Sequence, residues 1–252
     1  MLFRSKTLAD GGLLHPHAMT VTGKTVAENL QGAEVYNADV IRPLSNAIYN
    51  EGALAVLRGN LAPDGCVIKP SACAPKFQRH SGPAMVFDDY PSMKAAVEDP
   101  ELDVTEDHVL ILRNAGPQGG PGMPEWGMLP IPVKLVKQGV RDMLRISDAR
   151  MSGTSYGACV LHVSPESYIG GNLALVRNGD IITVDIAARS IRMEVSDEEL
   201  ARRRAEWQAP PARYQRGYGY MFSRHILQAD QGCDFDYLET SFGAPVDEPA
   251  IY

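Results

Sequence analysis

The chain has 252 residues, of which 44% are hydrophobic and 22% are charged, a balance typical of a globular protein with a sizeable core. Its formal net charge of −7 disfavours a general nucleic-acid surface, because neutralising phosphates needs clustered Lys and Arg. The sequence contains no run of about 18 apolar residues, and its N-terminus lacks the apolar stretch of a secretion signal. We therefore expect a cytoplasmic protein that binds neither nucleic acid nor a membrane.

The first 50 residues hold few clean periodic segments, because Gly11, Gly12, Pro16 and Gly23 interrupt the pattern. One local signal is "TVAE" at 25–28, which predicts a capping box that opens a short helix. We expect residues 1–50 to form a linker and the start of a domain.

From residue 54 onward the pattern changes to short apolar runs bounded by turns, which predicts about nine strands. These cover 53–59, 66–72, 84–89, 108–114, 143–149, 157–164, 172–180, 181–187 and 190–195, and helices are expected at 91–99, 132–139, 196–207 and 218–229.

So many strands with so few helices do not fit a doubly wound parallel sheet. We predict an α+β, β-rich fold, a mixed β-barrel over residues 51–207 flanked by a few helices. Residues 208–252 are predicted to form a C-terminal helix and tail packed on the barrel.

The charged cluster Arg202–Arg204 is predicted to be the solvated side of a helix. The four cysteines lie at 66, 73, 159 and 233, a spacing that fits neither a zinc motif nor a dense disulfide framework. All four are predicted to be reduced and partly buried thiols.

The segment "GPQGGPGMPEW" at 116–126 combines a Gly and Pro cluster with one carboxylate, Glu125. Such clusters mark turns more often than sites, so the segment alone favours a plain turn. A carboxylate on a glycine-rich loop also suits a hard cation such as Mg²⁺, although one carboxylate does not make a metal site. The turn-rich segment "GNLAPDGCVIK" at 59–69 also has two interpretations, a plain loop and a ligand contact.

The segment "SDARMSGTSYGA" at 147–158 places Ser152 and Thr154 two residues apart, so in an extended chain both would point the same way. A serine hydroxyl is a poor base in water, but a neighbouring metal cation can favour its alkoxide. The usual Ser-His scheme is unsupported, because the G-x-S-x-G pattern is missing and His162, in "VLHVSP", is interpreted as a structural histidine.

Five segments in this order resemble the dihydroxy-acid and sugar-acid dehydratase family, which includes phosphogluconate dehydratase. They are "TVTGKTVAEN", "AVLRGNLAPDGCVIK", "RNAGPQGGPGMPEW", "SDARMSGTS" and "HVSPESYIGGNLALVRNGDIITVDI". The resemblance runs from about residue 10 to the C-terminus.

The resemblance implies an enzyme of roughly twice this length. Its N-terminal α/β domain would carry the cysteines of an iron-sulfur cluster, expected to be 2Fe-2S, and most of the Mg²⁺ ligands. A C-terminal swivelling β/β/α barrel would close the site, and this chain resembles that half. None of the four cysteines matches a cluster ligand, so the cluster is expected in the N-terminal half.

Two roles transfer by position from the family. Glu125 resembles the Mg²⁺ ligand of the C-terminal domain, and Ser152 resembles the catalytic base, with Thr154 beside it to orient substrate or base. Glycines in these loops would let the backbone come close to metal and substrate. The implied reaction removes water from a 2,3-dihydroxy acid and yields a 2-keto-3-deoxy acid.

The ends of the motifs favour one branch of the family. "MPEW", "SDARMSGTS" and "RGYGYMFSRHILQADQGCDFDYLE" resemble pentonate and related aldonate dehydratases. The alternatives are the dihydroxy-acid dehydratase of branched-chain amino-acid biosynthesis and a non-catalytic, stand-alone barrel. The resemblance also implies a homodimer or homotetramer. The aromatic segment from Tyr214 to Tyr237 is a candidate surface for this contact, and the equal alternative is that its aromatic residues pack the last helix onto the core.

Overall fold

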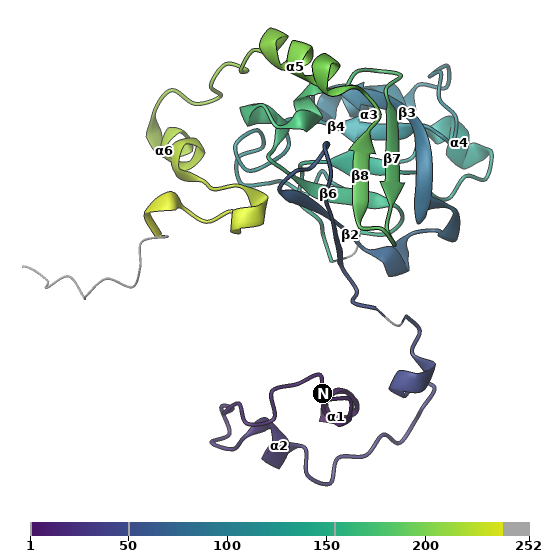
Figure 1. Ribbon diagram of the computed structural model, residues 1–252, viewed down its shortest axis with the longest axis vertical. Coiled ribbons are helices and arrows are strands. Elements are labelled where there is room, and N and C mark those ends of the chain that lie inside the picture. Colours follow the sequence, from purple (N-terminus) through teal and green to yellow (C-terminus); the bar gives the residue numbers. More distant parts are fainter. Residues whose placement is uncertain (1, 50, 154, 239–252) are drawn as a thin grey trace, which may run out of the picture. The chain divides into compact units, whose positions relative to one another are not determined.

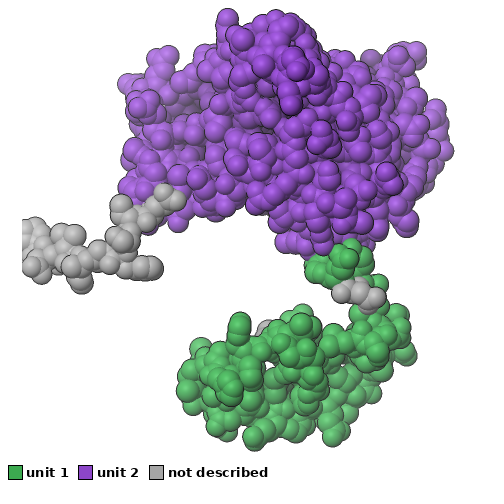
Figure 2. All heavy atoms as spheres, viewed as in Figure 1, with its two compact units in different colours: residues 1–53 green, residues 54–252 purple. Residues whose placement is uncertain are grey.

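The computed structural model describes residues 2–49, 51–153 and 155–238, and the chain divides into two compact units, residues 1–53 and 54–252 (Figure 2). In the first unit, helix α2 (Val26–Asn29) begins at the predicted capping box. The Thr25 side chain accepts from the Glu28 amide at 3.2 Å, and the Glu28 carboxylate accepts from the Thr25 amide at 2.7 Å. Helix α1 (Leu2–Asp10) is absent from the sequence-based prediction, and it buries no side chain that would have produced an apolar stripe.

The second unit contains one sheet of eight described strands in the order β1-β2-β6-β5-β4-β3-β7-β8 (Figure 1). Strands β3 to β6 are paired in parallel, whereas β1, β2, β7 and β8 pair antiparallel with their neighbours. The sheet is therefore mixed, as predicted. Its strands are β1 (Ala55–Leu57), β2 (Gly65–Ile68), β3 (Arg79–Phe87), β4 (Val109–Leu112), β5 (Arg145–Ser147), β6 (Cys159–Ser164), β7 (Ile181–Asp185) and β8 (Ser190–Met193).

The two edge strands of this sheet meet, which nearly closes it into a barrel. The Arg58 amide, just after β1, donates to the Arg189 carbonyl at 3.0 Å, and the Ile191 amide donates to the Arg58 carbonyl at 3.1 Å. A Cβ at residue 59 would lie 1.8 Å from the Ile191 carbonyl oxygen, so only glycine fits beside this contact. Closure leaves few strand-edge groups unpaired, as a barrel requires.

Strand β4 is buried on both faces, which explains why its sequence shows no alternation. Val109 and Ile111 point into the barrel core, whereas Leu110 and Leu112 belong to a second apolar cluster outside it. Helices α3 (Tyr90–Glu98) and α4 (Val133–Lys137) contribute to that outer cluster, so they cover the outer face of the parallel strands (Figure 1).

Two further helices follow the last strand. Helix α5 (Asp197–Glu206) lies within the predicted helix 196–207, and the side chain of its N-cap, Ser196, accepts from the Glu199 amide at 3.2 Å. Helix α6 (Gly217–His225) lies further along the chain, and the part of the predicted tail beyond residue 238 falls outside the described residues. Among the described helices, none has both the length and the apolar composition needed to cross a membrane.

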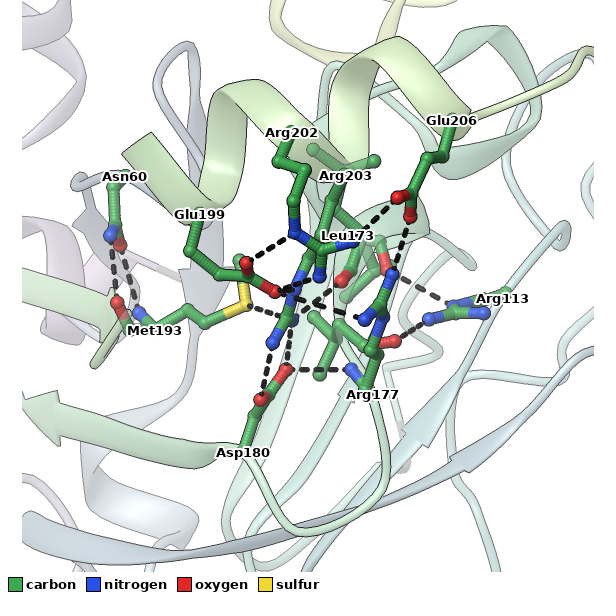
Figure 3. A network of polar contacts seen from close by, with 12 residues as sticks. Asn60, Arg113, Leu173, Arg177, Asp180, Met193, Glu199, Arg202, Arg203 and Glu206 are labelled. Atoms are coloured by element: carbon green, nitrogen blue, oxygen red, sulfur yellow. Dashed lines mark hydrogen bonds and ion pairs between the residues drawn. The ribbon is translucent and has the colours of Figure 1, made fainter. Parts of the chain in front are cut away.

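One predicted strand is wrong. The segment 172–180 forms a 3₁₀ turn over Asn172–Leu175 instead of a strand. Its carbonyl groups bond to arginine side chains: Arg113 Nε donates to the Leu173 carbonyl at 3.1 Å, and Arg203 Nη1 donates to the Leu175 carbonyl at 2.9 Å (Figure 3). Leu173 and Leu175 are buried in the core, so the apolar pattern was real but marked a core turn.

The interpretation of the basic cluster also needs correction. Arg202 lies on the solvent side of α5 and binds Glu199, but Arg203 is buried against Asp180 (Figure 3). Arg204 donates to the Asn172 side chain. Arg203 Nη2 lies 2.9 Å from Asp180 Oδ1, and the two side chains are only 8% and 11% exposed. The helix therefore uses a buried ion pair to bind the barrel.

Replacing Arg203 by Met should lower the free energy of unfolding by about 3–5 kcal/mol, because the change leaves the Asp180 carboxylate buried without its cation. Arg202→Met, one residue earlier and exposed, should lower this free energy far less, because solvent screens an exposed ion pair. Urea denaturation of the two variants checks this, and equal losses would show that the buried pair has no special role.

Candidate functional site

Three loops of the barrel leave the sheet at the same edge. Strands β4, β5 and β6 run parallel, so the segments that follow them, 113–127, 148–155 and 165–171, start side by side. Ligands of sheets with parallel strands bind at such carboxyl ends. The sequence motifs that carry Glu125 and Ser152 are the first two of these loops.

The glycine-rich part of the first loop folds around a buried carboxylate, Glu166. The amides of Gln118 and Gly119 donate to its oxygens at 2.9 Å each, and Gln228 Nε2 donates at 2.8 Å. A Cβ on Gly116 would lie 2.6 Å from a Glu166 oxygen, so this position must be glycine. Glycine at residue 116 therefore lets the loop backbone approach a carboxylate of the same chain.

A second buried carboxylate, Asp148, binds the same loop. It accepts from the Ala115 amide at 3.0 Å, the Ser167 amide at 2.8 Å and the Ser167 hydroxyl at 2.5 Å. Burial raises the pKa of Asp148. Burial, together with the charge of Asp148, also raises the pKa of Glu166, to about 7. Sequence reasoning missed both residues, although each is an acidic residue within two positions of the end of an apolar strand, a signal that could have found them.

Glu125 lies on the exposed part of the first loop, where its side chain is 53% exposed. Arg150 Nη1 lies 2.9 Å from Glu125 Oε1, and Arg150 Nε donates to the Met123 carbonyl at 2.6 Å. A Cβ on Gly127 would lie 2.4 Å from the Arg150 carbonyl, so the two loops are in close contact there. Arg150 therefore joins the Glu125 loop to the loop that carries Ser152.

Ser152 lies in a loop whose backbone is extensively bonded. Its amide donates to Ser155 Oγ at 3.1 Å, and its carbonyl accepts from Lys69 Nζ at 2.7 Å and from the Ser155 amide at 3.2 Å. Ser152 lines a hollow of about 430 Å³ together with Leu54, Val67, Lys69, Met151, Gly153, His162 and Ala229. Thr154, the second predicted catalytic hydroxyl, falls outside the described residues.

His162 has a structural role in this hollow, as its sequence context suggests. Its Nε2 accepts from the Met151 amide at 3.0 Å. Burial and the nearby charge of Arg150 lower its pKa, which keeps this nitrogen free of a proton and able to accept. The histidine thus fixes the start of the Ser152 loop.

The loops offer one carboxylate ligand for Mg²⁺, Glu125, and one carboxylate cannot hold the ion alone. In the part of the chain that the structure describes, no three His, Cys, Asp or Glu side chains gather as a metal site. The cysteines do not fit an iron-sulfur cluster either: Cys66, Cys73 and Cys159 are buried, and burial raises the thiol pKa of the first two to about 12. A cluster needs thiolates, which this environment disfavours.

Comparison with known proteins agrees with the dehydratase class that the barrel and its loop motifs indicate. The family model described as dihydroxy-acid/6-phosphogluconate dehydratase C-terminal matches residues 39–233. The chain therefore belongs to this family and contains its C-terminal domain.

Relatives with assigned names act on different substrates. The chain is 54% identical over 95% of its length to a 6-deoxy-6-sulfo-D-gluconate dehydratase of Pseudomonas putida, of which it covers 42%. It is 47% identical over 96% of its length to an L-arabonate dehydratase of Azospirillum brasilense, covering 42%. It is also 47% identical over 92% of its length to a dihydroxy-acid dehydratase of Leptothrix cholodnii, covering 41%. The chain thus spans about two-fifths of the length of these relatives.

The stability of the barrel should fall as the pH rises between about 4.5 and about 7. An unfolded Glu166 loses its proton near 4.5, whereas the folded one keeps it up to about 7, so the folded state binds the extra proton in this window. Each pKa unit of difference between the folded and unfolded states corresponds to about 1.4 kcal/mol. Glu166 should therefore account for a fall of roughly 3 kcal/mol in the free energy of unfolding across this pH range.

Urea denaturation across this pH range tests the assignment. Glu166→Gln should reduce the decline and leave the part that is due to other groups such as Asp148, whereas Glu106→Gln at an exposed position should leave the decline unchanged. An unaltered decline in Glu166→Gln would show that another group is responsible.

Proposed function

We propose that this chain is the C-terminal, site-closing part of a hydro-lyase that converts a 2,3-dihydroxy sugar acid, an aldonate such as a pentonate, to a 2-keto-3-deoxy acid. The observation that carries the proposal is the Arg150 contact, which brings the loops of Glu125 and Ser152 together at the carboxyl edge of the parallel strands. The names of the relatives support the same reaction class.

In this proposal Ser152 acts as the base that removes the proton from C2 of the substrate. Loss of the C3 hydroxyl completes the elimination of water, and the resulting enol tautomerises to the keto acid. Thr154, two residues on, would orient the substrate or Ser152. Glu125 would contribute one carboxylate to Mg²⁺, which its exposed position on the loop permits.

Mg²⁺ and an iron-sulfur cluster, 2Fe-2S in our proposal, would supply Lewis-acid chemistry and orientation when bound. The remaining Mg²⁺ ligands and all cluster ligands would come from an N-terminal half of the enzyme, because the described residues of this chain offer too few. Arg150 would then hold Glu125 on its loop through the Met123 carbonyl and the carboxylate itself.

The sugar-acid assignment rests on "MPEW" and the aromatic C-terminal motif, with two sugar-acid enzymes among the relatives. The dihydroxy-acid dehydratase of branched-chain biosynthesis is the second candidate, favoured by the Leptothrix relative. We further propose a cytoplasmic homo-oligomer that binds no nucleic acid or membrane.

Joining this chain to the N-terminal part of the Pseudomonas putida relative should give a holoenzyme that dehydrates aldonates in preference to 2,3-dihydroxyisovalerate. The chain alone, supplied with iron, sulfide and Mg²⁺, should show no turnover, because it lacks the cluster ligands. Turnover is measured as 2-keto acid formation. Turnover by the chain alone would refute the two-part proposal, and a preference for dihydroxyisovalerate would favour the second candidate.

The same N-terminal part can also be joined to the C-terminal domain of the Azospirillum relative. If that fusion is active and the fusion with this chain turns over no substrate, the non-catalytic barrel becomes the better explanation. The Azospirillum domain is the matched control, because its sequence is 47% identical to this chain.

Ser152→Ala in the same holoenzyme should abolish turnover with the unfolding midpoint unchanged. Glu125→Gln should weaken Mg²⁺ binding, measured by calorimetry, because a neutral amide replaces one anionic oxygen ligand. Ser81→Ala on β3, outside the three loops, is the control for both. Retained turnover in Ser152→Ala would remove this serine from the base role.

A further inference from the structure

Lys69, directly after β2, binds the Ser152 loop from a strand 83 residues away in the sequence. Its ammonium donates to three backbone carbonyls, those of Ser152 at 2.7 Å, Gly153 at 3.1 Å and Ser155 at 3.3 Å. An ammonium has three N–H donors, so these bonds use all of them. Lys69 lines the hollow beside Ser152, yet its protons point into the backbone and leave none for a substrate anion.

The three carbonyl oxygens converge on one point, which sets an electrostatic requirement. Their partial negative charges repel each other unless a cation lies between them. Removing the ammonium would take this donor from the Gly153 and Ser155 carbonyls and would leave the Ser152 carbonyl to the Ser155 amide. A part-buried carbonyl that loses its donor is unfavourable. Without Lys69, the loop would therefore rotate its peptide groups away from the present geometry.

The loop is also held through β6 and through a bond within the loop itself. The Met151 amide donates to His162 Nε2 on β6, and the Ser152 amide donates to Ser155 Oγ. Both backbone groups of Ser152 thus have partners, and the only cation among these partners is Lys69. The position of the serine is fixed jointly by β2 and β6.

We propose that Lys69 is a positioning residue for Ser152: it holds the loop in the one backbone arrangement that presents the serine to the substrate. The proposal rests on the proposed function, in which Ser152 is the base. A base acts only when it is correctly placed, and a displacement of about 1 Å can lower the rate ~100-fold.

The first test uses this chain alone and does not depend on catalysis. Lys69→Met keeps the aliphatic stem but removes the charge and the donors. Hydrogen exchange of a peptide covering 150–156 should become at least ~10-fold faster at the Ser152 and Ser155 amides, as expected when a loop loses about 1.4 kcal/mol of local stability. Lys76→Met, which removes an exposed lysine paired with Glu106, is the matched control and should leave this peptide unchanged.

The second test uses the holoenzyme. Lys69→Met should lower kcat ~100-fold, as for a base displaced by about 1 Å. KM and the Mg²⁺ affinity should stay near the wild-type values, because Glu125 lies on another loop. A general loss of structure would change all three quantities, and loss of a substrate-binding cation would raise KM instead.

Lys69→Arg keeps the charge and donors in a planar group, and it keeps the proposal testable if the Met variant does not fold. It should recover part of the exchange protection and part of kcat. The proposal is overturned if exchange of the 150–156 peptide is the same in wild type, Lys69→Met and Lys69→Arg, or if kcat is unchanged in Lys69→Met. If Ser152→Ala retains turnover while the exchange result holds, the base assignment fails and the loop contact stands.

Discussion

Two carboxylates buried at the carboxyl edge of the parallel strands, Asp148 and Glu166, constrain this barrel most. A buried carboxylate is costly unless several donors surround it, and most donors within reach here are backbone amides of the neighbouring loops. The loops after β4 and β6 therefore fold so that their amides point inward. Glycine is required at residue 116, because a side chain there would occupy the space of the Glu166 carboxylate.

The loop geometry of the candidate site follows from these anchors. The glycine-rich segment is fixed at its base by Glu166, so its outer part reaches Arg150 and offers Glu125 beside the second loop. That second loop is held in turn by Lys69 and His162 from two different strands. The loops that carry the two proposed functional side chains are thus held largely through hydrogen bonds to their backbone groups.

Local patterns in the sequence predicted much of the fold. Eight of the nine expected strands are present, and the capping box at Thr25 occurs where predicted, because both signals depend on neighbouring residues. Two of the failures have a common cause. The apolar run at 172–180 became a turn because Arg113 and Arg203 bind its carbonyls, and Arg203 is buried because Asp180 lies opposite it. These partners are distant in sequence, so no local pattern reveals them.

The sequence by itself determined the mixed β-rich barrel, the family and the two motifs with Glu125 and Ser152, because periodicity and motif order are properties of the chain alone. Only the tertiary structure decided why the Glu125 motif has glycine at residue 116, that Arg150 joins the two motifs and that Lys69 holds the serine loop. The physical reason is that a hydrogen bond depends on position in space and not on distance along the chain. Strand pairing brings residue 69 to residue 152, and that pairing exists only once the barrel has formed.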